Sequence, residues 1–233
     1  MGDSITRGSY LSQYEDGPRQ GQVIGLPNPL GGGWRKPLQD RLRAAGVAFE
    51  FAGELEYGAF GRDGVVDPDF QPRHHGLAGF GNERILNGGV VPTPPDVLET
   101  QKVTEIRVPD IITVLKKHQP NVVLLMSGAN GFDAPARDRL IHTLMEHLAG
   151  HLFVATIPPQ APPRLGFEQV DDYNASLASV VTGWRASGRS IHRVDVNHAL
   201  RVEDLTPDGV HPNAAGMEKI SEVWWQALLP VVI

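Results

Sequence analysis

The chain has 233 residues, of which 41% are hydrophobic, and this is enough to bury the core of one α/β domain. Its formal net charge is −6 and no run of Lys or Arg interrupts that balance, so the sequence lacks the electrostatic signature of proteins that bind nucleic acid or anionic membranes. The absence of cysteine excludes disulfides, thiolate nucleophiles and cysteine-bound zinc.

The sequence was next searched for membrane spans, targeting segments and repeats. No apolar stretch approaches the roughly 18 residues that a membrane span needs, and Met1 leads directly into Gly2-Asp3-Ser4 without a signal peptide. We therefore expect a cytoplasmic protein as the chain stands, and a secreted one if the true N-terminus is missing. No internal repeat or low-complexity tract is present, so we expect a single domain over residues 1–233.

Predicted loops and strands alternate with predicted helices. Residues 9–33 and 54–73 are rich in Gly, Pro, Gln and Asp without any periodicity, which predicts two long loops that face the substrate. Apolar runs predict strands, in chain order, at residues 48–53, 121–126, 151–157 and 190–196. Apolar residues at helical spacing predict helices that include residues 34–45, 108–115, 140–148, 170–184 and 217–228. This alternation indicates an α/β fold with a mainly parallel sheet.

Two short motifs at opposite ends of the chain carry candidate catalytic groups. In Asp208-Gly209-Val210-His211, a carboxylate three residues before a histidine can fix the tautomer of the ring and leave its other nitrogen free to take a proton. In Gly2-Asp3-Ser4, a serine hydroxyl follows a glycine that permits a tight backbone. Each motif alone is also an ordinary turn, and we interpret Asp3 as a structural residue of its turn.

Two further blocks supply candidate hydrogen-bond donors. One is His75-Gly76-Leu77-Ala78-Gly79-Phe80, after the second predicted loop. The other is Ser127-Gly128-Ala129-Asn130, which follows the strand at 121–126 at its carboxyl end, where ligand sites of open α/β sheets lie. Backbone N–H groups and an asparagine amide are suitable donors for the oxyanion of an acyl transfer.

The four blocks, in this order from residue 2 to residue 211, resemble those of the SGNH (GDSL-type) hydrolase superfamily. The stretch GDSITRG extends this resemblance, and DLTPDGVHPNAAG resembles the last block of carbohydrate-esterase-like members. The resemblance implies an α/β fold, a three-layer α/β/α sandwich with a mostly parallel five-stranded sheet in a flavodoxin-like order. It also implies Ser4 as nucleophile, His211 as general base and Asp208 as the partner of the base.

The oxyanion hole that the resemblance implies consists of the N–H groups of Ser4 and Gly79 and the side chain of Asn130. Gly76 and Gly79 compete for the second position, and the H-x-G-x-x-G-like wording favours Gly79. The family often has an acid directly after the asparagine, whereas this chain has Gly131 there and an acid only at Asp133.

The resulting prediction is a serine esterase that hydrolyses short-chain esters, above all acetyl esters and those of carbohydrates, through an acyl-enzyme on Ser4. The alternatives are a lipid esterase, lysophospholipase or thioesterase on the same scaffold, or a catalytically inactive carbohydrate-binding relative. We expect no cofactor and no metal, because His74 and His75 lack acidic neighbours at ligand spacing and are interpreted as a loop pair. The expected partner is a small-molecule or carbohydrate ester, with no nucleic acid and no membrane, and a homo-oligomer is compatible with the sequence.

A strand normally leads into the nucleophile of this fold, and here only Met1 and Gly2 precede Asp3. One hypothesis is that residues 230–233, beginning at Pro230, enter the sheet as that strand. The other is that the true N-terminus is missing and the C-terminal tail packs as a loop.

Overall fold

The computed structural model describes residues 1–13, 23–27, 32–56, 69–91 and 106–233. Its central sheet contains three parallel strands, β5 (Val122–Leu125), β6 (His151–Ala155) and β7 (Ile191–Val194), in the order β5-β6-β7. Val122 pairs with His151, and Leu152 pairs with Ile191. This is the parallel sheet that the alternating pattern predicted.

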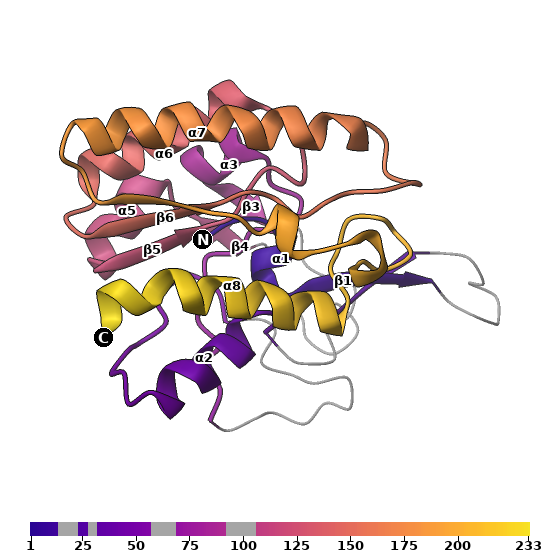
Figure 1. The fold of residues 1–233 in the computed structure, drawn as a ribbon, viewed down its shortest axis with the longest axis horizontal. Coiled ribbons are helices and arrows are strands. Elements are labelled where there is room, and N and C mark those ends of the chain that lie inside the picture. Colours follow the sequence, from indigo (N-terminus) through magenta and orange to yellow (C-terminus); the bar gives the residue numbers. More distant parts are fainter. Residues whose placement is uncertain (14–22, 28–31, 57–68, 92–105) are drawn as a thin grey trace.

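Helices cover both faces of this sheet, which gives three layers (Figure 1). One face carries α3 (Asn82–Asn87), α5 (Ile111–His118), α6 (Ala134–His147) and α7 (Val170–Ala186). The other face carries α2 (Arg35–Ala44) and α8 (Ala214–Val232). Alternate residues of β6 serve the two cores, because Leu152 and Val154 pack with the first group of helices while Phe153 and Ala155 pack with the second.

The first two residues extend the sheet beyond β5. Gly2 forms parallel bridges to Gly76 on one side and to Met126 on the other. Gly2 N–H donates to His75 O at 3.0 Å, and Met126 N–H donates to Met1 O at 3.1 Å. Met1 and Gly2 therefore occupy the place next to β5 at which a strand was expected to lead into the nucleophile. The predicted five-strand count is not confirmed, since the parallel sheet has three strands in the part of the chain that the structure describes.

Two of the strand predictions were wrong. Residues 48–53 form no strand, because Phe51 N–H donates to the Gln71 side chain at 2.6 Å instead of to a neighbouring strand. The C-terminal tail is helical through Val232, so residues 230–233 neither enter the sheet nor pack as a loop. The apolar stripe of α8 continues at helical spacing to Val231, which packs in the same core as Trp224 and Leu228.

The predicted loop at residues 9–33 contains a hairpin. Its strands are β1 (Ser9–Gln13) and β2 (Val23–Pro27), which pair antiparallel, while residues 14–22 and 28–31 lie outside the described residues. Of the second predicted loop, residues 57–68 lie outside the described residues, and Leu55 forms an antiparallel bridge to His74. A second small hairpin pairs β3 (Gly89–Val91) with β4 (Ile106–Val108), which the sequence did not predict.

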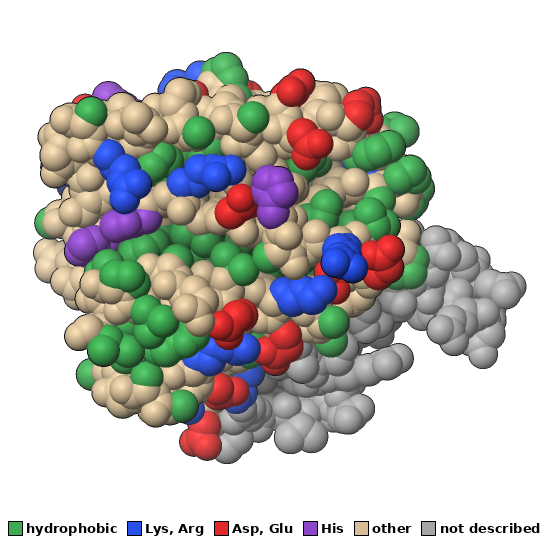
Figure 2. Space-filling view, in the orientation of Figure 1, with side chains coloured by type: hydrophobic (Ala, Val, Ile, Leu, Met, Phe, Trp, Pro, Cys, Tyr) green, Lys and Arg blue, Asp and Glu red, His purple; other side chains and the backbone are tan. Residues whose placement is uncertain are grey.

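The surface carries both signs of charge. On the face shown in Figure 2, Lys and Arg side chains lie among Asp and Glu side chains, and neither sign gathers into one large patch on the described part of that face. Within the ranges given above, no helix has the length and apolar character needed to cross a bilayer.

Candidate active site

A tight turn and one helical turn present Ser4. Asp3 is the N-cap of α1 (Ser4–Arg7), and its side chain accepts a hydrogen bond from Ile5 N–H at 3.0 Å. Gly2 has φ +152°, and a Cβ at this position would lie 2.0 Å from Met126 O, so only glycine fits between the flanking segments. The side chain of Ser4 is thereby fixed at the carboxyl edge of β5.

Ser4, His211 and Asp208 form an unbroken series of hydrogen bonds. Ser4 Oγ lies 2.7 Å from His211 Nε2, and His211 Nδ1 lies 2.7 Å from Asp208 Oδ2. An ionised carboxylate can only accept, so the ring proton belongs on Nδ1 and Nε2 is left as the acceptor for the serine hydroxyl. The structure therefore brings together the three residues that the two end motifs proposed, across 207 positions of sequence.

The carboxylate of Asp208 is itself held by its own turn. Its Oδ1 accepts from Val210 N–H at 2.8 Å, from His211 N–H at 2.9 Å and from Thr206 Oγ at 2.9 Å. Burial alone would raise the pKa of Asp208, but the hydrogen bonds and the charge of His211, with the two backbone N–H groups, bring it below its ordinary value. Asp208 is thus an ionised acceptor with a fixed orientation.

Asp3 joins the turn of Ser4 to the loop of Asn130. The side chain is fully buried, and its second oxygen accepts from Ala129 N–H at 3.2 Å. Burial raises the pKa of Asp3, and hydrogen bonds from Ile5 N–H and Ala129 N–H oppose this rise. These contacts are those of a structural residue, which agrees with the interpretation of Asp3 from the sequence.

The candidate oxyanion donors lie on three adjoining segments. Ser4 N–H is in the first turn of α1, where no helical acceptor exists. Asn130 is exposed, and its Nδ2 donates one hydrogen bond to Phe80 O at 3.1 Å, which places the amide beside the turn of Gly79. The N–H of Gly76 is occupied by His74 Nδ1 at 2.9 Å, whereas no acceptor among the described residues takes the N–H of Gly79. Of the two glycines, the geometry favours Gly79.

The segment after β6 connects the histidine turn to the asparagine loop. Ala161 N–H donates to Gly209 O at 2.9 Å, and Arg164 Nη2 donates to Ala129 O at 2.9 Å. Sequence reasoning missed Arg164, because nothing in its local pattern distinguishes it from an ordinary surface arginine. The same reasoning placed Tyr173 only on an apolar helix face, although a buried phenol needs a hydrogen-bond partner and in that way signals a role beyond packing.

His74 and His75 are buried, and each residue is 3% exposed. Burial lowers the pKa of both imidazoles, that of His75 to about 3, so they are neutral at ordinary pH. Across the described ranges, no group of three or more His, Cys, Asp or Glu side chains is arranged to hold a metal ion. His74 instead serves the backbone through its bond to Gly76.

A serine, a histidine and a carboxylate in this hydrogen-bond series, at the carboxyl edge of a parallel sheet, define the class of serine hydrolases. Comparison with known families then gives the particular one. The model of the GDSL-like lipase/acylhydrolase family matches residues 1–224, so the chain belongs to that family. The prediction of an SGNH-type carboxylic ester hydrolase is thereby confirmed.

One curated relative is a multidomain esterase from Ruminococcus flavefaciens, with 26% identity over 248 aligned positions. The match covers 94% of this chain but 31% of the relative, so the chain spans about a third of that protein's length.

Two family 3 carbohydrate esterases have similar structures. That of Clostridium thermocellum has a TM-score of 0.65 and 23% identity, covering 100% of this chain and 94% of that one. That of Talaromyces cellulolyticus has a TM-score of 0.68 and 17% identity, covering 100% and 95%. A carbohydrate acetylesterase from Sinorhizobium meliloti has a TM-score of 0.63 and 15% identity, covering 99% and 97%. At these identities the likeness confirms the predicted fold alone.

Proposed function

We propose that this chain is a serine esterase that removes short acyl groups, above all acetyl, from carbohydrate esters, and that residues 1–233 act as one catalytic domain. The observation that carries the proposal is the series from Ser4 through His211 to Asp208, with both hydrogen bonds at 2.7 Å. The carbohydrate part rests on the structural neighbours, which are carbohydrate esterases by name.

The proposed reaction has two halves. Ser4 Oγ attacks the ester carbonyl carbon while its proton passes to His211 Nε2, and the carbonyl oxygen becomes an oxyanion. The N–H groups of Ser4 and Gly79 and the Asn130 amide donate to that oxyanion. The intermediate collapses to an acyl-enzyme, and the departing alcohol takes the proton from His211. Water then attacks the acyl-enzyme by the same route and releases the carboxylic acid.

A panel of acetylated sugars and p-nitrophenyl esters of increasing acyl length tests the substrate class. We expect acetyl esters to give the highest kcat/KM and activity to fall with acyl length. The competing candidate is an esterase of longer acyl or lipid esters, favoured by two apolar side chains on the segment after β6, Leu165 at 87% exposure and Phe167 at 38%. A rise in kcat/KM with acyl length would select that candidate.

The Ser4→Ala variant tests the nucleophile. Turnover should fall by about 10⁶ and labelling by a fluorophosphonate should disappear, because the attacking oxygen is gone. The melting temperature should change little, since the substitution removes one hydroxyl and no packing. If the wild-type chain itself resists labelling, it is an inactive carbohydrate-binding relative, and if Ser4→Ala keeps activity within about tenfold, the nucleophile lies elsewhere.

A further inference from the structure

The loop that carries Asn130 is held by a side chain from another layer. No acid follows Asn130 directly, and Asp133 is engaged as the N-cap of α6, where it accepts from Ala136 N–H at 2.8 Å. Besides the contacts of Asp3 and Arg164 with Ala129, the main chain of the loop is bound by Tyr173 of α7, whose Oη donates to Ser127 O at 2.9 Å.

The direction of this hydrogen bond is fixed by a third group. Asn82 Nδ2 lies 3.0 Å from Tyr173 Oη and can only donate, so the single phenolic proton is directed at Ser127 O. Burial raises the pKa of Tyr173 to about 12, which keeps the phenol a neutral donor throughout the pH range of ester hydrolysis.

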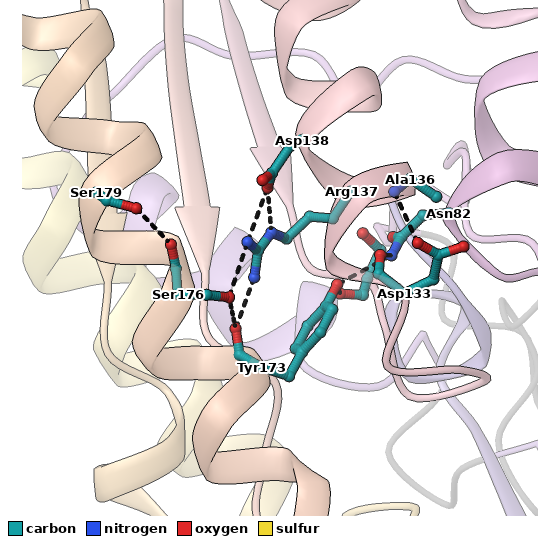
Figure 3. Close-up of polar contacts among 9 residues, drawn as sticks. Asn82, Asp133, Ala136, Arg137, Asp138, Tyr173, Ser176 and Ser179 are labelled. Carbon is teal, nitrogen blue, oxygen red and sulfur yellow. Dashed lines mark hydrogen bonds and ion pairs between the residues drawn. The ribbon is translucent and has the colours of Figure 1, made fainter.

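The ring of Tyr173 is held by packing contacts, in addition to the hydrogen bonds of its hydroxyl (Figure 3). The Arg137 guanidinium lies 4.7 Å from the ring centroid and donates to Tyr173 O at 2.6 Å. Gly128 lies so close to Tyr173 that a Cβ at this position would be 2.4 Å from Tyr173 Oη. The loop therefore packs directly against Tyr173, whose position is fixed by these contacts.

These contacts close a circuit around the candidate oxyanion hole. Asn130 Nδ2 donates to Phe80 O at 3.1 Å, Asn82 follows two residues later at the start of α3, and Asn82 is bound to Tyr173. Through Ser127 the circuit returns to the loop of Asn130. Tyr173 is thus one of the side chains that set the position of the Asn130 amide relative to the turn of Gly79.

We propose that Tyr173 is a positioning residue that acts through Asn130, holding its amide where it and the N–H of Gly79 meet the same oxyanion. This inference rests on the proposed function, in which Asn130 is an oxyanion donor.

A double-mutant cycle on kcat tests the inference, with Tyr173→Phe, Asn130→Ala and the double variant. Phenylalanine keeps the ring beneath Gly128 and removes only the hydroxyl. Asn130→Ala should lower kcat about 10²- to 10³-fold. Tyr173→Phe alone should lower kcat about three- to tenfold with KM within about twofold, as expected for one misplaced hydrogen bond in the transition state. In the Asn130→Ala background, the same change should lower kcat by less than about twofold.

Two further variants separate positioning from general stability. Ser176→Ala is the matched control, because Ser176 Oγ donates to Tyr173 O at 2.9 Å without touching the loop, and its kcat should stay at the wild-type value. Asn82→Ala breaks the same circuit from its other end and should show the same dependence on Asn130. Turnover is expressed per active site titrated with a fluorophosphonate, so a variant that folds poorly still gives an interpretable rate.

Each outcome has one meaning. If the losses from Tyr173→Phe and Asn130→Ala multiply in the double variant, Tyr173 acts independently and the inference is overturned. If Tyr173→Phe leaves kcat unchanged while Asn130→Ala lowers it, the inference fails and the proposed function stands. If Asn130→Ala has no effect, the proposed oxyanion hole itself is wrong.

Discussion

Replacing Asp208 by asparagine should reverse the tautomer of His211. One oxygen of Asp208 accepts from Val210 N–H, His211 N–H and Thr206 Oγ. Among the residues that the structure describes, the other accepts from His211 Nδ1 alone. An asparagine amide has one oxygen, and placing it against Nδ1 would leave two backbone N–H groups facing an NH₂. Each unsatisfied donor costs about 1–3 kcal/mol, so the amide oxygen should take the position with more donors.

The consequence for catalysis follows from that orientation. The amide NH₂ would then point at His211 Nδ1, which must accept, and the ring proton would move to Nε2. A protonated Nε2 cannot receive the proton of Ser4, and the loss in kcat should be about 10⁴-fold, equivalent to about 5.5 kcal/mol.

The assay is kcat on p-nitrophenyl acetate for Asp208→Asn, with melting temperature measured on the same sample. The control is Thr206→Val, which removes one donor to the same carboxylate but leaves the tautomer unchanged, and it should lose less than about tenfold. A loss of less than about tenfold in a folded Asp208→Asn enzyme would refute the tautomer argument, and an equal loss in both variants would show that support of the turn matters instead.

For two other perturbations, a change of pH and the substitution Gly2→Ala, the structure gives the direction of the expected effect. As pH falls, the Asp208 carboxylate should stay ionised below the ordinary pKa of an aspartate, because its own pKa lies below that value. The stability from Asp208 is present above its unfolded pKa and is lost only as pH falls through its lower folded pKa. The melting temperature of the wild type should therefore fall more steeply in acid than that of Asp208→Asn, and equal slopes would contradict this account. Gly2→Ala should lower the free energy of unfolding by more than about 2 kcal/mol in urea titrations, because its Cβ would lie 2.0 Å from Met126 O. The control Gly183→Ala, in a helix with open space around it, should be neutral or stabilising, and equal losses would argue against the steric account.

The sequence predicted more of the candidate site than of the sheet around it. Residue type and spacing within two short motifs predicted the roles of Ser4, Asp208 and His211. The structure brings these three residues into contact. Residues 48–53 have the composition of a strand, but a strand also needs a partner, and composition cannot show that the Gln71 side chain takes the hydrogen bond of Phe51.

The C-terminal tail and Tyr173 illustrate two other limits. Val231 and Val232 are β-branched and suggested a strand, yet the spacing of apolar residues along α8 already placed Val231 on the buried stripe. Tyr173 was correctly placed on the buried side of its helix, but its hydroxyl partner lies 46 positions away in sequence, at the end of another element. Local patterns predict which groups need partners and leave the identity of distant partners open.

The insertion of Met1 and Gly2 beside β5 has a consequence for the time course of folding. The contact of Met1 with Leu124 spans 123 positions, that of Asp3 with Ala129 spans 126, and that of Ser4 with His211 spans 207. Contacts so distant in sequence form late, because the entropy of closing a long loop must be overcome before they stabilise the chain. During refolding, recovery of esterase activity should therefore lag behind the return of helical circular dichroism, and nascent chains that end before residue 211 should lack activity even where their sheet has formed.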